Sequence, residues 1–234
     1  MSNDYFRFKQ FCVRHDRCAM KVGTDGVLLG AWGSVEGKRI LDIGTGTGLI
    51  VLMAAQRNPE ATVLGIDIDE QAILQAQENI AESPFCDRVS CTVQDATIIH
   101  SEMGFDAILC NPPFFTEDTL PDNISRALAR NSKSLPFPQL IKQVSMLLTE
   151  GGKFSVIIPG SHMQDFVSQC LSEKLHLIRR CIVRTKAGKP PRRVMLTFST
   201  VAGFTIEESE LCLTNEDGTK STGYKELTNS FYLH

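Results

Sequence analysis

The stretch RILDIGTGTG, residues 39–48, decides the fold. Its first five residues have the length and apolar character of a buried strand. The glycines at every second position after it let the backbone turn tightly and approach a ligand closely. The apolar residues 49–56 that follow have the length of a helix. A strand, a glycine turn and a helix in this order predict the first unit of a sheet covered by helices.

The same alternation continues along the chain. Three more segments read as helices, and the first of these places Ile73, Ala76 and Ile80 on one face. These helices are expected at 70–80, 140–148 and 163–171, the second ended by the glycine pair at 151–152. Six more segments read as strands: 61–66, 89–93, 105–110, 154–158, 176–184 and 192–200. The pattern predicts an α/β fold with a doubly wound, mostly parallel, seven-stranded Rossmann-like sheet, and an antiparallel hairpin at the edge where no helical crossover intervenes.

Three regions follow from this arrangement. Residues 1–37 precede the first sheet strand and are expected to form a cap or lid over the ligand-binding edge. Residues 38–200 form the main domain, and residues 201–234 are expected to be an extension packed on the same domain. The loops after the first four strands should gather at the carboxyl edge of the sheet, where open α/β sheets bind ligands.

Composition excludes several classes of protein. The 234 residues are 42% hydrophobic and carry a net charge of −3, which excludes a disordered chain and a uniformly basic nucleic-acid binder. The sequence has no apolar run of membrane-spanning length and no signal peptide, so no membrane partner is expected. The eight cysteines form no C-x-x-C pair and no histidine has zinc-ligand spacing. We therefore expect reduced thiols, a cytoplasmic location and no metal; a monomer is favoured, although the sequence leaves the oligomeric state open.

Acidic residues stand at the ends of three expected strands. Asp42, just before the glycines, could receive the amino group of an amino-acid ligand. Asp67 could accept hydrogen bonds from ribose hydroxyls, and Asp95 could accept one from the exocyclic amine of adenine, although a turn aspartate explains Asp95 equally well. A dinucleotide fingerprint starting at Gly44 would need glycine at position 49, where Leu49 stands. The set fits an adenosine that carries an amino acid, such as S-adenosylmethionine.

The sharpest signal is NPPF at residues 111–114, directly after the fourth strand. The side-chain oxygen of Asn111 and the carbonyl of Pro112 are suited to accept both N–H bonds of a planar amine. Pro113 helps to fix the backbone, so the acceptors are in place before reaction. Phe114 offers a face for stacking a planar base. A rigid proline loop with a core phenylalanine is the alternative, and the position after the strand disfavours it.

These residues resemble the class I S-adenosylmethionine-dependent methyltransferases, and within them the N-P-P-[YF] group that methylates exocyclic or amide nitrogens. The resemblance implies that residues 111–114 hold the target amine, with Phe114 in place of the commoner tyrosine. The candidate catalytic residues are Asn111, Pro112, Pro113 and Phe114. The candidate cofactor residues are Thr24, Asp42, Gly44, Gly46, Gly48, Asp67, Ile68, Asp95, Ala96 and Asn111.

The flanking segments allow a narrower resemblance. Residues 8–11 (FKQF), 20–32 (MKVGTDGVLLGAW) and 231–233 (FYL) are similar to the bacterial tRNA methyltransferases that act on N6 of adenine 37 in a valine tRNA. This resemblance implies that residues 21–30 are a lid near the methionine end of the cofactor, with Thr24 and Asp25 as its polar candidates. A helix cap explains these two residues nearly as well.

Charge is unevenly distributed. Residues 174–193 contain eight Lys and Arg and no acid, so the rest of the chain carries −11. Residues 7–21 add five cations against Asp16 alone. Such clusters predict a docking surface for RNA phosphates, and a solvated edge hairpin is the alternative. The candidate RNA-binding residues are Lys9, Arg14, Arg130, Lys186, Lys189, Arg192 and Arg193.

Three other functions are alternatives to tRNA methylation. A protein glutamine-N5-methyltransferase would use the same Asn-Pro-Pro-Phe loop, but it needs a peptide groove and gains little from a basic edge. An RNA-binding module without catalysis would not need that loop. An NAD-dependent oxidoreductase is disfavoured by Leu49.

Overall fold

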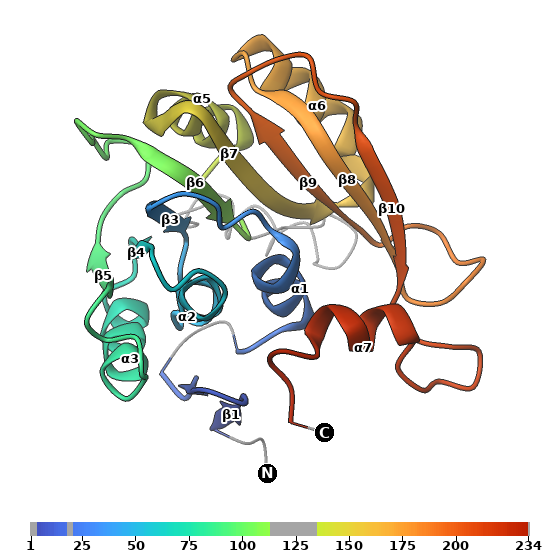
Figure 1. Ribbon diagram of the computed structural model, residues 1–234, viewed down its shortest axis with the longest axis horizontal. Coiled ribbons are helices and arrows are strands. Elements are labelled where there is room, and N and C mark those ends of the chain that lie inside the picture. The colour runs from blue at the N-terminus through green and yellow to red at the C-terminus, as the bar shows by residue number, and fades with distance from the viewer. Residues whose placement is uncertain (1–3, 18–20, 113–134, 234) are drawn as a thin grey trace, which may run out of the picture.

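The protein is described by a computed structural model that covers residues 4–17, 21–112 and 135–233. Its centre is an eight-stranded sheet with the order β10-β8-β9-β7-β6-β3-β4-β5 (Figure 1). The strands are β3 (Arg39–Ile43), β4 (Thr62–Asp67), β5 (Val89–Val93), β6 (Phe105–Cys110), β7 (Leu148–Pro159), β8 (His176–Arg184), β9 (Arg193–Ser199) and β10 (Glu207–Cys212).

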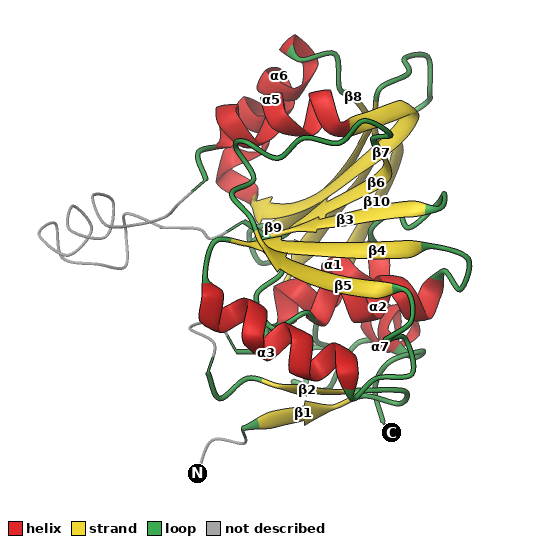
Figure 2. Ribbon diagram, turned by 90° about the vertical axis from the view of Figure 1, so that its left-hand side faces the viewer, coloured by secondary structure: helices red, strands yellow, loops and turns green. Residues whose placement is uncertain are grey.

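Helices cover both faces of this sheet (Figure 2). On one face lie α1 (Thr24–Trp32), α2 (Leu49–Arg57) and α3 (Glu70–Ala81), and on the other lie α5 (Phe137–Leu147), the short helix η2 (Gly160–His162) and α6 (Met163–Ser172). Each face has its own apolar core. The face of α3 that contains Ile73, Ala76 and Ile80 is buried, as its spacing predicted.

Strand directions confirm the predicted edge hairpin. Strands β3 to β7 run parallel, whereas β9 pairs antiparallel with both β7 and β8. The expected seven strands are present, but β10 adds an eighth, parallel to β8, so the predicted strand number is wrong. This strand comes from the C-terminal extension, and four of its six residues are exposed acids or serine, which hides the apolar alternation of a strand.

The boundary between α5 and β7 also differs from the prediction. The helix ends at Leu147, before the glycine pair that was expected to stop it. Leu148 adopts an extended conformation and pairs with Phe105 of β6, so the strand begins there. Gly151 and Gly152 lie inside β7 and not after the helix.

The N-terminal region divides into two parts. A small hairpin of β1 (Tyr5–Arg7) and β2 (Cys12–Arg14) packs against α3, below the helical layer in Figure 2. Helix α1 then packs on α2 and on α7 (Thr222–Thr228) near the C-terminus. Among the described helices, none is long and apolar enough to cross a membrane.

Candidate active site

A cavity of about 540 Å³ opens at the carboxyl ends of the central strands. One wall is the segment 21–26 that leads into α1, and another is the glycine loop 44–47. Asn111 and Pro112 line it from the end of β6, and Arg192 and Arg193 line it from the start of β9. The structure therefore brings the expected lid, the glycine loop and the start of the Asn-Pro-Pro-Phe loop to one place.

The glycine loop has the backbone shape that only glycine adopts easily. Gly44, Gly46 and Gly48 have φ angles of +74°, +53° and +80°. A Cβ atom on either of the first two would meet no atom within 4 Å, so both face open space. A Cβ on Gly48 would instead lie 3.2 Å from the Cβ of Ala76 on α3. The first two glycines thus keep the cavity open, and the third lets α3 approach.

Asp67 joins the second strand end to this loop. One carboxylate oxygen accepts from the Gly46 N–H at 3.0 Å, and the other accepts from the Asp69 N–H at 3.0 Å. An ionised carboxylate can accept further bonds, so these contacts leave capacity for a ligand hydroxyl. Asp69 caps α3 by accepting from the Gln71 N–H at 2.9 Å.

Asp95 serves a turn in this structure. Its Oδ1 accepts from the N–H and the hydroxyl of Thr97, both at 2.7 Å. The turn interpretation of Asp95 therefore has direct geometric support, and its role toward adenine stays a prediction. Ile68, which follows Asp67, is half-buried, and Ala96, which follows Asp95, is buried.

Asp42 is enclosed beneath the glycine loop. It has no solvent exposure, and neither carboxylate oxygen has a hydrogen-bond partner among the described residues. Burial raises the pKa of Asp42 to about 7; the Thr45 hydroxyl opposes the rise and the charge of Asp67 adds to it. An unpartnered buried carboxylate is costly unless it is protonated or meets a cation. Asp42 is not among the described residues that line the cavity, so its predicted contact with an ammonium group stays a prediction.

Asn111 lies beside α1. A Cβ on Gly26 would be 3.1 Å from Leu49 and 4.0 Å from the Asn111 amide nitrogen, so glycine allows this close approach. Pro112 is buried in the same wall. The predicted catalytic residues Pro113 and Phe114, and the candidate RNA-binding Arg130, lie outside the described residues.

The lid segment makes an ion pair across the cavity. The N-cap of α1 is Gly23 without a side-chain cap, so the interpretation of Thr24 or Asp25 as the helix cap is wrong. Instead, Asp25 accepts from the Arg193 guanidinium at 2.8 Å. Both side chains are mostly buried, at 21% exposure for Arg193 and 30% for Asp25. This pair joins the start of α1 to the start of β9.

Much of the basic block is neutralised by β10, which the sequence did not indicate. The parallel register sets the acids of β10 beside the arginines of β8. The opposing charges lie more than 20 residues apart in the chain, so local charge counting could not pair them. The pairs are Arg179–Glu207 at 3.3 Å, Arg180–Glu208 at 2.6 Å and Arg184–Glu210 at 2.9 Å.

The remaining RNA-binding candidates differ in their surroundings. Arg14 pairs with Glu82, the Lys9 ammonium donates to the Asn229 carbonyl and the Lys186 ammonium donates to the Glu216 carbonyl. Lys189 and Arg192 are exposed, and within the described ranges neither makes an ion pair. The turn that contains these two residues therefore retains the most available positive charge of the predicted edge.

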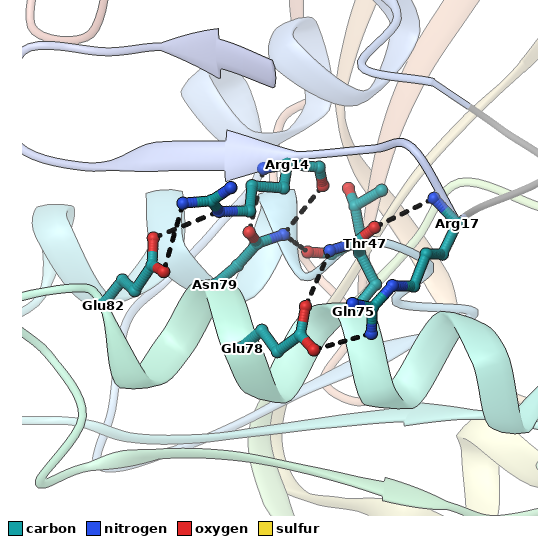
Figure 3. A network of polar contacts seen from close by, with 7 residues as sticks. All are labelled: Arg14, Arg17, Thr47, Gln75, Glu78, Asn79 and Glu82. Atoms are coloured by element: carbon teal, nitrogen blue, oxygen red, sulfur yellow. Dashed lines mark hydrogen bonds and ion pairs between the residues drawn. The ribbon is translucent and has the colours of Figure 1, made fainter. Parts of the chain in front are cut away.

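Two buried amides on α3 hold the N-terminal segment, and one of them also reaches the glycine loop; neither was predicted from the sequence. The Asn79 amide donates to the Thr47 carbonyl at 2.9 Å and to the Arg14 carbonyl at 3.0 Å (Figure 3). Its oxygen accepts from the Arg14 N–H at 2.8 Å. Gln75, one turn earlier, accepts from the Arg17 N–H at 3.0 Å. Two amides four residues apart on an otherwise apolar helix face were the available signal.

Surface ion pairs flank these amides. Arg17 pairs with Glu78 at 2.7 Å, and the Arg14–Glu82 pair lies one turn further along α3 (Figure 3). Both pairs are about half exposed, so the buried amides contribute more to the attachment than the charges do.

In the part of the chain that the structure describes, no group of three or more His, Cys, Asp or Glu side chains could hold a metal ion.

Comparison of the solved structures supports the fold. A predicted O-methyltransferase from Agrobacterium tumefaciens superposes with a TM-score of 0.70 at 17% identity, over 88% of this chain and 96% of that one. TrmN from Thermus thermophilus superposes with a TM-score of 0.54 at 21% identity, over 74% of this chain and 47% of that one.

Sequence comparisons identify the family. The Methyltransferase small domain family model matches residues 22–176. The tRNA1(Val) (adenine(37)-N6)-methyltransferase of Bacteroides thetaiotaomicron is 46% identical, over 100% of this chain and 99% of that protein. The protein of the same name from Citrobacter koseri is 42% identical, over 97% of this chain and 94% of its own length. This chain therefore belongs to the tRNA1(Val) (adenine(37)-N6)-methyltransferase family.

Proposed function

We propose that this protein transfers a methyl group from S-adenosylmethionine to N6 of adenine 37 in the anticodon loop of a valine tRNA. The observation that carries the proposal is the meeting of the glycine loop with Asn111 and Pro112 in one cavity. The names of the full-length relatives support the choice of substrate.

The residues around the cavity fit the proposed cofactor. The open positions at Gly44 and Gly46 leave room for a ligand against the backbone, and the Asp67 carboxylate faces the same loop. Asp42 is a buried acid without a partner among the described residues, which suits a nearby cationic group. When bound, S-adenosylmethionine supplies an electrophilic methyl group on a positively charged sulfur. Thr24 and the rest of the lid segment would close the opposite side.

The chain's contribution to the reaction is to orient the amine. An exocyclic amine is a weak nucleophile because its lone pair is delocalised into the ring. The Asn111 side-chain oxygen and the Pro112 carbonyl would accept its two N–H bonds and direct the lone pair toward the methyl group. The cofactor would supply the methyl group to this nitrogen, and its thioether would be the leaving group. The amine proton then leaves to water or by way of these acceptors.

Access to the amine requires the base to leave the RNA stack. Bases of a single-stranded loop are splayed out at lower cost than bases of a duplex. The exposed cations Lys189 and Arg192, next to the cavity, would hold phosphates near the target. A cytoplasmic location and a monomeric state are part of the same proposal.

The test uses the intact protein. It is incubated with labelled S-adenosylmethionine and total tRNA from a strain that lacks the protein, and the RNA is digested to nucleosides. Label in N6-methyladenosine supports the proposal, and label only in protein would favour the glutamine-N5 alternative. An Asn111→Ala variant should retain cofactor binding and lose turnover; methylation at the wild-type rate would refute the role of Asn111.

A further inference from the structure

A second cavity, of about 450 Å³, lies beside the candidate active site. The two cavities share Val22, Gly23 and Thr24 of the lid segment as lining residues. The other walls of the second cavity come from β1, α1, α7 and the last residues of the chain. In Figure 1, α7 lies beside α1, and β1 lies further below them.

One wall of this cavity is aromatic. The rings of Phe6 and Tyr232 meet edge-on at 5.6 Å, and both side chains are half-buried. Phe8 stacks beneath Tyr232 at 5.8 Å, and the Tyr224 hydroxyl donates to the Tyr232 hydroxyl at 3.1 Å. These contacts fix the rings from behind, so the wall offers ordered aromatic surface rather than mobile side chains.

Positively charged side chains also line this cavity. Lys220 and Lys225 line it, and no Asp or Glu is among its described lining residues. The Lys220 ammonium lies 4.5 Å from the centre of the Tyr224 ring. An aromatic surface next to unopposed ammonium groups suits a planar base attached to a phosphate.

We propose that the second cavity binds a nucleotide of the tRNA that neighbours the target adenine, with its base on the Phe6–Tyr232 wall and its phosphate near Lys220 and Lys225. The inference rests on the proposed function. The volume of the second cavity lies within the range of small-molecule sites. An RNA strand that delivers one base to the active-site cavity must continue past its rim, and the lid segment that both cavities share forms part of that rim.

The first arm of the test is a binding titration. An anticodon stem-loop RNA is compared with two versions that carry an abasic nucleotide on one side of the target adenine or on the other. We expect one of these to bind the wild-type protein about tenfold more weakly, which is the usual effect of one stacked base. A Phe6→Leu/Tyr232→Leu variant should bind intact and abasic RNA equally. Discrimination that survives in this variant would overturn the aromatic wall as the site, and so would the absence of any effect from either abasic RNA.

The second arm measures charge. A Lys220→Gln/Lys225→Gln variant should reduce the slope of log affinity against log salt by about 0.7 to 1.4, because each phosphate contact contributes roughly 0.7 for a single strand and the variant removes one or two such contacts. The matched control is Lys38→Gln/Lys153→Gln, which removes one charge just before β3 and one within β7, neither of them among the described lining residues of the two cavities, and should leave the slope unchanged. Equal slopes in the two variants would refute the proposal. Thermal melts confirm that every variant is folded.

Methyl transfer by the wild-type protein is measured in parallel. If the wild type methylates adenine N6 while the cavity variants bind RNA as it does, the second cavity is not a subsite and the proposed function stands. If the wild type binds the stem-loop but forms no N6-methyladenosine, the proposed function fails independently. If it does not bind RNA, both proposals fail.

Discussion

Replacing Asn79 with alanine should loosen both the N-terminal hairpin and the glycine loop. The side chain is 1% exposed and makes three hydrogen bonds to backbone groups of Thr47 and Arg14. Asn79→Ala leaves two carbonyls and one N–H without these partners. Each unsatisfied buried group costs about 1–3 kcal/mol, and the Arg14 groups are only partly buried, so we expect a loss of about 3–5 kcal/mol in the free energy of unfolding.

The same substitution should weaken cofactor binding. Thr47 belongs to the loop that lines the cavity, and an unanchored loop must be ordered at the moment of binding. We expect a rise of about tenfold in the Kd of S-adenosylmethionine, which corresponds to about 1.4 kcal/mol. Urea denaturation followed by circular dichroism measures the stability, and isothermal titration calorimetry measures the affinity.

Gln77→Ala is the matched control. Gln77 lies on the same helix and is exposed, and its amide makes one hydrogen bond, to the Cys91 carbonyl, away from the hairpin. It should cost about 1 kcal/mol and leave the Kd unchanged. If Asn79→Ala lowers the stability no more than this control, the hydrogen-bond argument is wrong. If it lowers the stability but leaves the Kd within twofold of the wild type, the coupling to the loop is refuted.

Three further predictions follow from the site. Asp42→Asn should remove a pH dependence of stability. Folding raises the pKa of Asp42 to about 7, so the folded state binds more protons than the unfolded state between about pH 4 and 7. The free energy of unfolding of the wild type therefore falls as the pH rises through that range, by on the order of 4 kcal/mol at most. Urea titrations of the ligand-free protein at pH 5 and 8 test this, and an unchanged pH dependence in the variant would refute it. Gly46→Ala and Gly48→Ala both strain a positive φ, but Gly48→Ala should lower the melting temperature more and Gly46→Ala should weaken cofactor binding more, because only the Cβ at position 48 meets another helix; the reverse order would contradict the geometry. Replacing the three β10 glutamates with glutamine should strengthen tRNA binding at low salt by freeing the β8 arginines, and unchanged affinity in a filter-binding assay would show that this edge does not face RNA.

The parts of the fold that depend on local pattern could be predicted from the sequence. The parallel strands, the glycine turn and the buried face of α3 follow from short-range apolar spacing, and all three are present. Strand β10 could not be predicted in this way, because its acids are stabilised by arginines of β8 and not by an apolar face of its own. Its place in the sheet depends on a long-range pairing that the local sequence does not show.

The candidate site shows the same difference between local and long-range features. The loop residues 44–47 and Asn111 could be placed together because the carboxyl ends of parallel strands share one edge. The Asp25–Arg193 pair joins residues that are 168 positions apart. The local sequence therefore predicts a lid or cap role for Asp25 and an RNA contact for Arg193, but not the pair. Asn79 was overlooked because a polar residue on a helix is ordinarily a surface residue.

The central claim is that this chain methylates the exocyclic amine of an adenine in tRNA. The most direct measurement is mass spectrometry of the nucleosides and of the anticodon-loop fragments of valine tRNA from a strain that lacks the protein, before and after incubation with the purified protein and S-adenosylmethionine. We expect N6-methyladenosine at position 37 with the wild-type protein and not with Asn111→Ala. Methylation at another atom or only of protein, or equal methylation by the two proteins, would contradict it.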